Sequence, residues 1–475
     1  MSNLEKYYIN GEWVLPLSKT TMNVINPANE KNIGKIILAN ELDVNFAVEA
    51  AKSAFPNFSQ TSKEERLELL KKLLDISKKR LPELAKVISL EMGAPITMSL
   101  ELQADAAVGH LEGYIEALIN QVEREKLANG DIQVREPVGI CGLITPWNWP
   151  VNQIALKVLP ALAAGCTCVL KPSEFTPLSS VMYSEMVHEA GFPPGVFNMI
   201  QGDGPIAGAS LSKHPDIGMM SFTGSTRAGS SVSKDAADSI KRVALELGGK
   251  SPNIVFSDCD LEERILGSIE ECYINTGQSC DAPTRLIVER SCYEQVLKIA
   301  KSVGEAVKVG DPLLEGDHLG PLVSDIQYGR VQAMIEKGIK EGATLLVGGL
   351  GKPDGFNKGY WVRPTIFSDA NNKMAIAQEE IFGPVLTIIP FDTEEEAIKI
   401  ANDTPYGLAA YIQSGDLKRA ERIANKLRVG MVHINGGGFN YGSPFGGYKQ
   451  SGNGREGGIL GIEDFQEVKT LHYPE

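Results

Sequence analysis

The chain is poor in the residues and patterns that mark several specialised classes of protein. It has only seven cysteines and six histidines among 475 residues. An odd number of cysteines, spread thinly through a long chain, favours free thiols over a disulfide framework. The histidines are scattered, and none stands in the spacing of a metal-binding motif. The sequence therefore predicts no resident metal and no disulfide scaffold.

Positive charge and long apolar runs are also missing. The net charge is -14 at pH 7, and an acidic chain is a poor match for the phosphate backbone of nucleic acid. No apolar run is long enough to cross a bilayer. The first residues lack the charged and apolar regions of a signal peptide, so the cytoplasm is the expected location. Neither nucleic acid nor a membrane is an expected partner.

The composition and length fit an ordinary globular protein of more than one domain. Hydrophobic residues make up 43% of the chain and charged residues 22%, and 475 residues exceed what one hydrophobic core usually supports. Short strands are expected over residues 7–37. Helical periodicity then runs from Glu41 to about Asn120, with a clear amphipathic helix over 64–74. Pro82 is expected to open a further helix at a first-turn position.

Strands and helices alternate from residue 138 onward. Apolar strands are expected near 138–144, 166–170, 197–201 and 218–222, with helices over 150–164, 178–190, 206–213 and 226–237. This alternation predicts a parallel sheet with helices on both faces. The pattern restarts after Gly249, with helices expected at 261–274, 291–306, 325–341 and 394–402, which predicts a second α/β domain. Strands expected near 131–137 and 465–471 must find partners within the chain or across a subunit interface.

The carboxyl ends of the strands in the first domain form the expected ligand-binding edge. Four polar or glycine-rich segments follow these strands: Thr145–Trp149, Lys171–Glu174, Gly202–Gly204 and Thr223–Ser225. The usual dinucleotide pattern Gly-x-Gly-x-x-Gly is absent, but Ser225 precedes a helix whose N-terminus offers backbone N–H groups to a phosphate. Lys171 and Glu174 are either ribose ligands or a surface ion pair at a turn.

One cysteine stands in a setting that packing does not explain. Cys280 lies in the stretch Asn275-Thr-Gly-Gln-Ser-Cys280-Asp-Ala-Pro-Thr-Arg285, among residues that form loops and place hydrogen bonds. A thiol on a polar loop is either an incidental surface cysteine or a nucleophile. The adjacent Asp281 is unusual, because a carboxylate beside a nucleophilic sulfur opposes formation of the thiolate. Asp281 is instead a candidate for attracting a cationic substrate.

Seven stretches in this chain resemble the aldehyde dehydrogenase superfamily, and specifically its NAD(P)-dependent, acid-forming members. They occur in the order of that family and span nearly the whole sequence. The stretches are Thr145-Pro-Trp-Asn-Trp-Pro150, Lys171-Pro-Ser-Glu-Phe-Thr-Pro177, Phe222-Thr-Gly-Ser225, Leu245-Glu-Leu-Gly-Gly-Lys-Ser-Pro252, Gly277-Gln-Ser-Cys280, Glu379-Glu-Ile-Phe-Gly-Pro384 and Ser443-Pro-Phe-Gly-Gly-Tyr-Lys449.

The resemblance implies an α/β fold of two Rossmann-like parallel-sheet domains with a small β oligomerisation arm. Residues 1–120 and 138–247 would form the cofactor-binding domain, and residues 248–455 the catalytic domain. Residues 121–137 and 456–475 would form the arm, which makes the chain a homodimer or homotetramer.

The resemblance also implies catalytic roles. Cys280 would attack an aldehyde as a thiolate, and the side-chain amide of Asn148 would stabilise the oxyanion together with the backbone N–H of Cys280. Glu246 would activate the water that hydrolyses the resulting thioester. The alternative for Glu246 is an exposed carboxylate at a helix end, but its apolar neighbours favour burial and a raised pKa. Lys171 is counted with both the catalytic and the cofactor-binding residues.

The expected cofactor is NAD, with NADP possible. Glu174 favours NAD because its carboxylate would repel a 2′-phosphate, an effect that Lys171 partly offsets. Lys171 and Glu174 would bind the adenosine ribose, and Glu380 the nicotinamide ribose. The complete expected cofactor set is Thr145, Pro146, Trp147, Lys171, Glu174, Gly204, Gly224, Ser225, Leu247, Glu380 and Phe382.

The substrate is an aldehyde whose identity the sequence does not specify. The expected substrate-binding residues are Trp149, Leu156, Ser279, Asp281, Phe439 and Phe445. Their aromatic members favour an apolar throat, although such residues also serve in plain packing.

Three alternative functions remain open. A relative that passes the thioester to coenzyme A or phosphate would have no task for Glu246. A cofactor-free cysteine hydrolase would need a histidine base near Cys280, and no histidine lies between His214 and His318. A silent binding or structural protein would not need Asn148, Glu246 and Cys280 together.

Overall fold

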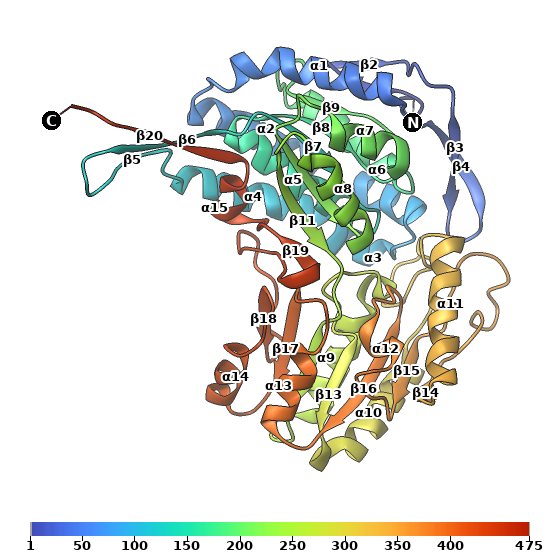
Figure 1. Cartoon of the computed structure of the whole chain (residues 1–475). Coiled ribbons are helices and arrows are strands. Elements are labelled where there is room, and N and C mark those ends of the chain that lie inside the picture. The colour runs from blue at the N-terminus through green and yellow to red at the C-terminus, as the bar shows by residue number, and fades with distance from the viewer. Residues whose placement is uncertain (1, 475) are drawn as a thin grey trace.

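The computed structural model describes residues 2–474, which fold around two large sheets (Figure 1). The first sheet has eight strands in the order β19-β11-β10-β7-β8-β9-β1-β2. Strands β7 to β11 run parallel, and β1, β2 and β19 are antiparallel additions at the two ends. The bounds are β1 (Tyr7–Ile9), β2 (Glu12–Val14), β7 (Ile140–Ile144), β8 (Thr167–Lys171), β9 (Phe197–Met199), β10 (Met219–Gly224), β11 (Arg242–Leu247) and β19 (Gly452–Asn453).

Helices cover both faces of the first sheet. Successive side chains of its central strands point to opposite faces, and because these side chains are apolar, both faces must be buried. In β7, Cys141 and Leu143 pack with α2, α4, α5 and α6, whereas Ile140 and Ile144 pack with α1 and α7. The helical segments are α1 (Glu41–Phe58), α2 (Lys63–Glu91), α3 (Ile96–Met98), η1 (Ser99–Ala104), α4 (Asp105–Asn120), α5 (Pro150–Ala164), α6 (Pro177–Glu189), η2 (Gly204–Gly208), α7 (Ala209–Lys213), α8 (Thr226–Ala237) and α15 (Gly458–Glu463).

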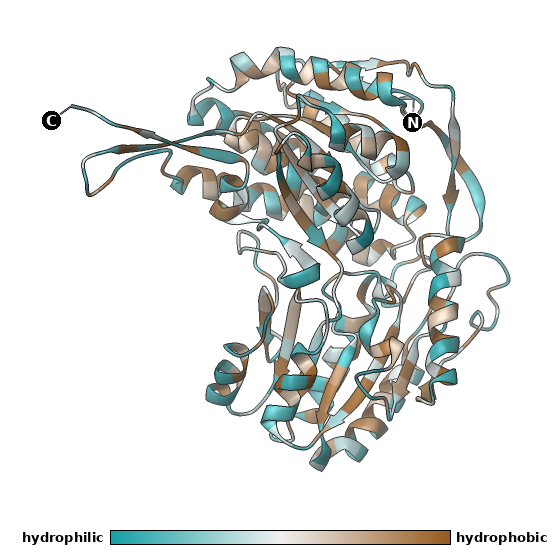
Figure 2. Ribbon diagram, viewed as in Figure 1, coloured by the Kyte–Doolittle hydropathy of each residue, from teal (hydrophilic) through white to brown (hydrophobic). Residues whose placement is uncertain are grey.

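The second sheet has seven strands in the order β14-β15-β16-β13-β12-β17-β18, and only β14 is antiparallel to its neighbour. Its strands are β12 (Pro252–Val255), β13 (Arg285–Glu289), β14 (Thr344–Val347), β15 (Thr365–Ser368), β16 (Val385–Phe391), β17 (Ala409–Gln413) and β18 (Met431–Ile434). Its helical segments are α9 (Leu261–Tyr273), η3 (Ile274–Gly277), η4 (Arg290–Cys292), α10 (Tyr293–Ala306), α11 (Asp325–Lys340), α12 (Ala375–Gln378), α13 (Glu394–Asn402), α14 (Leu417–Ala424) and η5 (Lys449–Ser451). Hydrophobic residues run along its central strands (Figure 2).

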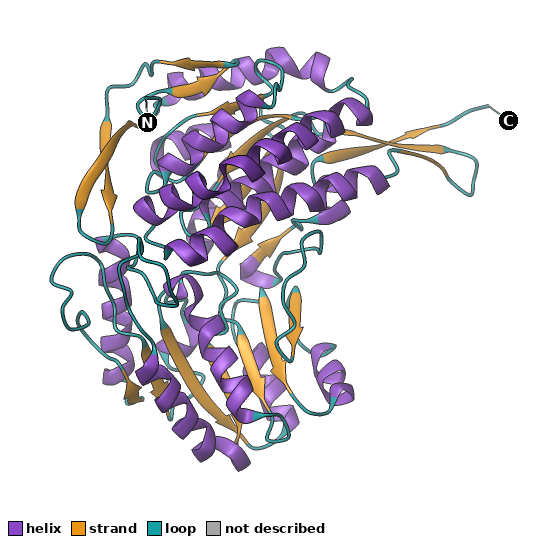
Figure 3. Ribbon diagram, turned by 180° about the vertical axis from the view of Figure 1, so that it is seen from behind, coloured by secondary structure: helices purple, strands orange, loops and turns teal. Residues whose placement is uncertain are grey.

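Two smaller sheets complete the fold. Strands β3 (Thr21–Asn26) and β4 (Lys31–Ile37) form an antiparallel pair. Strands β5 (Arg124–Lys126), β6 (Ile132–Pro137) and β20 (Gln466–Leu471) form a three-stranded antiparallel sheet that projects from the body (Figures 1 and 3). The two expected isolated strands are therefore partners of each other. We call this three-stranded sheet the arm.

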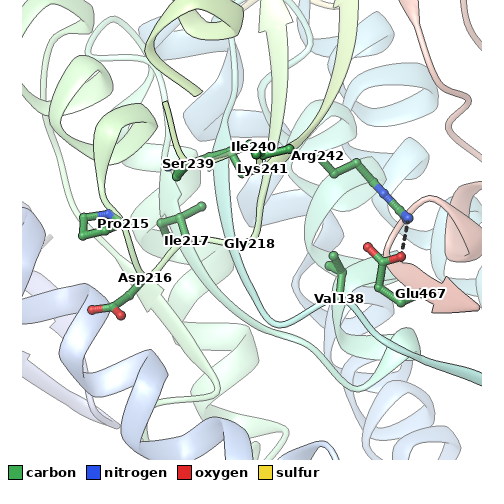
Figure 4. Close-up of a pocket in the computed structure, with 10 residues that line it drawn as sticks. All are labelled: Val138, Pro215, Asp216, Ile217, Gly218, Ser239, Ile240, Lys241, Arg242 and Glu467. Atoms are coloured by element: carbon green, nitrogen blue, oxygen red, sulfur yellow. Dashed lines mark ion pairs between the residues drawn. The ribbon is translucent and has the colours of Figure 1, made fainter. Parts of the chain in front are cut away.

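An ion pair ties the arm to the first sheet. Arg242, at the start of β11, lies 3.0 Å from Glu467 of β20, beside a surface hollow of about 550 Å³ (Figure 4). The hollow is at the amino ends of β10 and β11, where Gly218 and Arg242 lie. It is therefore at the edge of the sheet opposite to the expected ligand-binding edge.

The two-sheet α/β fold with its arm confirms the fold class expected from the sequence. One expectation about a helix was wrong: Pro82 does not open a helix but lies inside the single helix α2. The capping box formed by Ser62 and Glu65 starts that helix, and a helix can continue through proline with the loss of one backbone hydrogen bond. Among residues 2–474, no helix is both long and apolar enough to span a membrane.

Candidate active site

The four segments expected at the ligand-binding edge do lie along one edge of the first sheet. They follow the neighbouring parallel strands β7, β8, β9 and β10. The backbone N–H of Thr145 donates to the carbonyl of Lys171 at 3.2 Å, and the Lys171 ammonium donates to the carbonyl of Gly202 at 2.8 Å. These contacts join three of the four segments directly.

Lys171 is a buried anchor for this edge. Its side chain is 3% exposed, and its ammonium donates to the carbonyls of Pro172 and Gly202, each at 2.8 Å. The Glu174 carboxylate lies 3.8 Å away and is half-buried. Burial lowers the pKa of the Lys171 ammonium, and the nearby Glu174 opposes that change. Lys171 therefore positions Glu174, which keeps its oxygens available at the surface.

A left-handed turn precedes Cys280. Asn275, Thr276 and Gly277 all have positive φ, at 54°, 58° and 70°, which is rare for a β-branched residue such as threonine. The Thr276 hydroxyl donates to the carbonyl of Gly320 at 3.1 Å. A Cβ atom at position 277 would lie 2.2 Å from the carbonyl oxygen of Gly383. The turn is thus held against the segment that leads into β16.

Buried amides brace this turn from the other side. The side chain of Asn148 donates to the carbonyl of Gln278 at 3.0 Å. The backbone carbonyl of Asn148 accepts from Gln103 at 2.9 Å and from Asn275 at 2.8 Å. All four side chains are at most 3% exposed, so their hydrogen bonds fix the geometry of Asn148 relative to the loop that carries Cys280.

Several carboxylates surround the sulfur of Cys280. Burial is the largest cause that raises the pKa of this thiol well above its usual range, followed by the negative charges of Asp281, Glu380 and Glu246. The backbone N–H of Cys280 itself acts in the opposite direction. Cys280 is therefore a neutral thiol in the ligand-free protein at neutral pH.

Glu246 is a buried carboxyl group whose two oxygens are free to form hydrogen bonds. It lies on β11, is 5% exposed, and neither carboxyl oxygen has a hydrogen-bond partner within residues 2–474. A Cβ atom at Gly446 would come within 2.6 Å of one of these oxygens. Burial raises the pKa of Glu246 well above its usual range, and the charge of Glu456 adds to that rise.

Glu456 forms an ion pair with the fully buried ammonium of Lys157 on α5. Burial raises the pKa of Glu456 as it does that of Glu246, and the positive charge of Lys157 opposes both rises. The charges of Lys157 and Glu456 therefore help to set the pKa of the nearby Glu246.

A cleft of about 670 Å³ brings most of the expected residues together. Cys280, Glu246 and Asn148 line it, together with seven of the residues expected to bind a cofactor: Pro146, Trp147, Gly224, Ser225, Leu247, Glu380 and Phe382. Thr145, Lys171, Glu174 and Gly204 lie on the same edge of the sheet but outside this lining.

Glu380 and Phe382 project into the cleft from the segment before β16. The Glu380 carboxylate accepts from the backbone N–H of Gly249 at 3.0 Å, and burial raises its pKa to about 7. A Cβ atom at Gly248 would lie 2.2 Å from the other oxygen of this carboxylate. The ring of Phe382 meets Trp147 edge-on, with centroids 5.3 Å apart.

The expected substrate-binding residues lie on the other side of the Cys280 loop. The Trp149 indole N–H donates to the Ser279 hydroxyl at 3.0 Å, which in turn donates to Asp281 at 2.8 Å. Phe439 and Phe445 meet edge-on, with centroids 6.1 Å apart. Of these residues only Asp281 and Phe439 line a cleft, which is a second one beside the Cys280 loop. Leu156 is 3% exposed and packs in the core of the first sheet, so the structure does not place it at the substrate site.

Sequence reasoning missed the residues that hold the expected site residues in place or set their electrostatic environment. Gln103, Lys157 and Glu456 support the site from distant segments, and Gln327 holds the carbonyl of Phe382 at 2.8 Å. Only Lys157 had a visible signal: it is the single charged residue in the apolar helix 150–164, and a buried lysine needs an acidic partner.

The chain has close relatives over its full length. A family model described as the aldehyde dehydrogenase family matches residues 13–471. The chain is 51% identical over 472 residues to 3-succinoylsemialdehyde-pyridine dehydrogenase from a Pseudomonas species, with 99% of each chain covered. A crystal structure of an aldehyde dehydrogenase from Bartonella henselae has a TM-score of 0.97 and 48% identity, covering 99% of each chain.

A second solved structure contains ligands. It is a variant of aldehyde dehydrogenase C from Pseudomonas syringae in complex with NAD+ and octanal. Its TM-score is 0.98 at 46% identity, with 99% of this chain and 97% of that chain covered.

Proposed function

Because this chain belongs to the aldehyde dehydrogenase family, we propose that it oxidises an aldehyde to a carboxylic acid with NAD, through a thioester on Cys280. The observation that carries the proposal is the single cleft lined by Cys280, Asn148 and Glu246. A nucleophile, an amide donor and a buried carboxyl group on one cleft match the needs of acyl transfer to water.

The residues of the cleft fit a dinucleotide. Ser225 caps the N-terminus of α8, which offers backbone N–H groups and a positive dipole end to phosphates. Trp147 and Phe382 provide an apolar wall for a planar ring, and Glu380 provides acceptors for ribose hydroxyls. The buried hydroxyl of Thr223 on this cleft has no partner within residues 2–474 and is free to bind a ligand. NAD+ in the related Pseudomonas syringae structure supports the same choice.

NAD, when bound, accepts the hydride that leaves the aldehyde carbon. Its adenosine ribose would be held by Glu174, whose position Lys171 fixes. The carboxylate of Glu174 favours free ribose hydroxyls over a 2′-phosphate, so we propose a preference for NAD over NADP.

Cys280 forms the bond to the aldehyde carbon as its thiol loses a proton. Because the ligand-free thiol is neutral, its proton leaves to water in the open cleft as the sulfur attacks the bound aldehyde. The oxygen of the adduct then accepts from Asn148. One N–H of the Asn148 amide is engaged with Gln278, and an amide nitrogen has a second N–H that remains for the substrate.

Glu246 then takes a proton from water as that water attacks the thioester. A raised pKa makes a carboxylate a stronger base, and burial supplies that rise. The products are the carboxylic acid and the free Cys280 thiol. Glu246 returns the proton to the sulfur as the thioester breaks, and Lys157 and Glu456 act on Glu246 only through their charges.

The alternative functions are less well supported. Transfer of the thioester to coenzyme A or phosphate leaves Glu246 without a role. A cysteine hydrolase would need a histidine base, and no histidine lines the cleft of Cys280 within residues 2–474.

A panel of aldehydes with NAD and with NADP tests the proposal. Aliphatic, aromatic, ω-amino and ω-carboxy aldehydes would each be assayed by the absorbance of the reduced cofactor. Cys280→Ala should still bind NAD and oxidise none of them. Dehydrogenase activity that survives in Cys280→Ala would contradict the proposed mechanism.

A further inference from the structure

A second cleft lies beside the Cys280 loop and shares no lining residue with the cleft that Cys280 lines. It has a volume of about 480 Å³ and runs between α9, the strands β12, β17 and β18, and the loop 436–439. Asp281 and Phe439 are part of its wall. Because Asp281 directly follows Cys280, the wall of this cleft begins one residue from the proposed nucleophile.

The cleft carries an excess of negative charge. Four acidic residues line it: Glu263, Glu270, Glu271 and Asp281. Its one arginine among the described residues, Arg264, is engaged with the carbonyl of Asn435 at 2.8 Å and with Glu263 at 3.0 Å. The carboxyl groups of Glu270, Glu271 and Asp281 have no basic partner within residues 2–474. Burial, followed by the charge of Asp281, raises the pKa of Glu271 to about 7, so a bound cation would favour the ionised form of Glu271.

Buried polar atoms at the base of the cleft also lack partners. The side-chain oxygen of Gln413, a residue 4% exposed, has no hydrogen-bond partner within residues 2–474. One ring nitrogen of His433, whose ring stacks on that of Tyr411 with centroids 4.6 Å apart, also has no partner there. The free lone pairs on the Gln413 oxygen add to the negative potential of the cleft, which favours a cationic occupant.

We propose that this cleft recognises a positively charged nitrogen carried by the aldehyde substrate, such as a quaternary ammonium or pyridinium group. The inference rests on the proposed function and names the substrate class for the same site. Carboxylates attract such a group, and Phe439 offers it an aromatic face. An inorganic ion fits less well, because no group of three or more His, Cys, Asp or Glu residues within 2–474 is placed to hold a metal.

A matched pair of substrates tests the proposal. 4-(Trimethylammonio)butanal and 5,5-dimethylhexanal have the same shape and differ in the charge of one atom. The wild-type protein is expected to show a higher kcat/KM for the charged aldehyde, and added NaCl should reduce the preference, since exposed charges are screened.

Glu271→Gln and Asp281→Asn should each reduce the ratio of the two kcat/KM values about two- to fivefold, the range of an exposed ion pair. Glu262→Gln removes an exposed carboxylate of α9 that does not line the cleft, and should leave the ratio unchanged. Titration with butyltrimethylammonium should detect binding to the wild-type protein that Glu271→Gln weakens, independently of turnover.

Turnover of both aldehydes at equal kcat/KM would overturn the inference and leave the proposed function standing. If Glu271→Gln and Asp281→Asn reduced kcat/KM equally for both aldehydes, the inference would likewise be overturned and the proposed function would stand. Failure to oxidise either aldehyde, when Cys280 is reduced and NAD is bound, would count against the proposed function itself and against this inference with it.

Discussion

Cys280 works among carboxylates that oppose its ionisation. Asp281 follows it directly, and Glu246 and Glu380 share its cleft. All three raise the pKa of the thiol, which protects the ligand-free enzyme from oxidation and alkylation, since those reactions need the thiolate. The sequence expectation that Asp281 opposes thiolate formation agrees with this geometry. We therefore propose that the thiolate forms as the substrate binds.

We expect Glu380 to make NAD binding sensitive to pH. Burial raises its pKa to about 7, so the group is protonated below that pH and loses acceptor capacity for a ribose hydroxyl. The dissociation constant of NAD should therefore rise as pH falls below about 7, by up to about tenfold per pH unit. Calorimetric titration with NAD across this range measures the effect.

Glu380→Gln should bind NAD weakly at every pH and lose the dependence. Glu336→Gln is the control, because the carboxylate of Glu336 is exposed, pairs with Lys340 at 2.7 Å and does not line the cleft. An unchanged dissociation constant across the range in the wild-type protein would contradict the role given to Glu380.

At the level of elements, the left-handed turn before Cys280 is in contact with the segment that carries Phe382 into the proposed NAD cleft. Gly277 lies against Gly383, which directly follows Phe382. Gly277→Ala would place a Cβ atom 2.2 Å from the carbonyl of Gly383 at a φ of 70°. Because backbone must move to relieve that contact, the variant should lower kcat at least about tenfold and weaken NAD binding together.

Gly329→Ala is the matched control. Gly329 lies within α11 and lines neither cleft, and a Cβ atom there meets nothing within 4 Å. Alanine favours helix over glycine, so activity and NAD affinity should stay unchanged and thermal stability should not fall. Normal kinetics in Gly277→Ala would show that the turn does not position the nucleophile.

The sequence predicted elements well where local signals agree. Helix α8 begins at Thr226 and ends at Ala237 as expected, and Ser225 caps it. The prediction failed at Pro82, where tertiary packing of α2 outweighs the local preference of proline. The π-helical segments η1 and η2 were not expected, since no residue pattern distinguishes their hydrogen bonds from those of an α-helix.

The supporting residues of the site were beyond sequence reasoning for a different reason. Gln103 and Gln278 lie 175 positions apart in the chain, yet they meet at Asn148 and Asn275. Only the folded chain brings such amides together. The roles of Cys280, Asn148 and Glu246 came from family resemblance and stay predictions, which the shared cleft supports.

At the scale of the whole molecule, the alternation of strands and helices predicted two sheets covered by helices, and the structure confirms this. The division at residue 247 stays a proposal. Strand β19, within the range 248–455, pairs with β11 of the first sheet. This strand places Gly452 beside Glu246, so the C-terminal part of the chain contributes to the wall around the proposed base.

We propose that the arm assembles the chain into a dimer or tetramer. Its outer strands β5 and β20 have free edges, and Val468 on β20 is 55% exposed. Val468→Asp should shift the mass measured by light scattering toward the monomer. Leu15→Asp, at a residue 76% exposed on the body of the protein, should not. An assembly that survives Val468→Asp at low concentration would exclude this surface.

The most direct test of the central claim is the intact mass of Glu246→Gln after mixing with an aldehyde and NAD. This variant should release one equivalent of reduced cofactor and then stop. Its mass should rise by that of the aldehyde less two hydrogens, with the added acyl group on Cys280. Steady turnover at the wild-type rate, or an acyl group on another residue, would contradict a thioester on Cys280 that water activated by Glu246 hydrolyses.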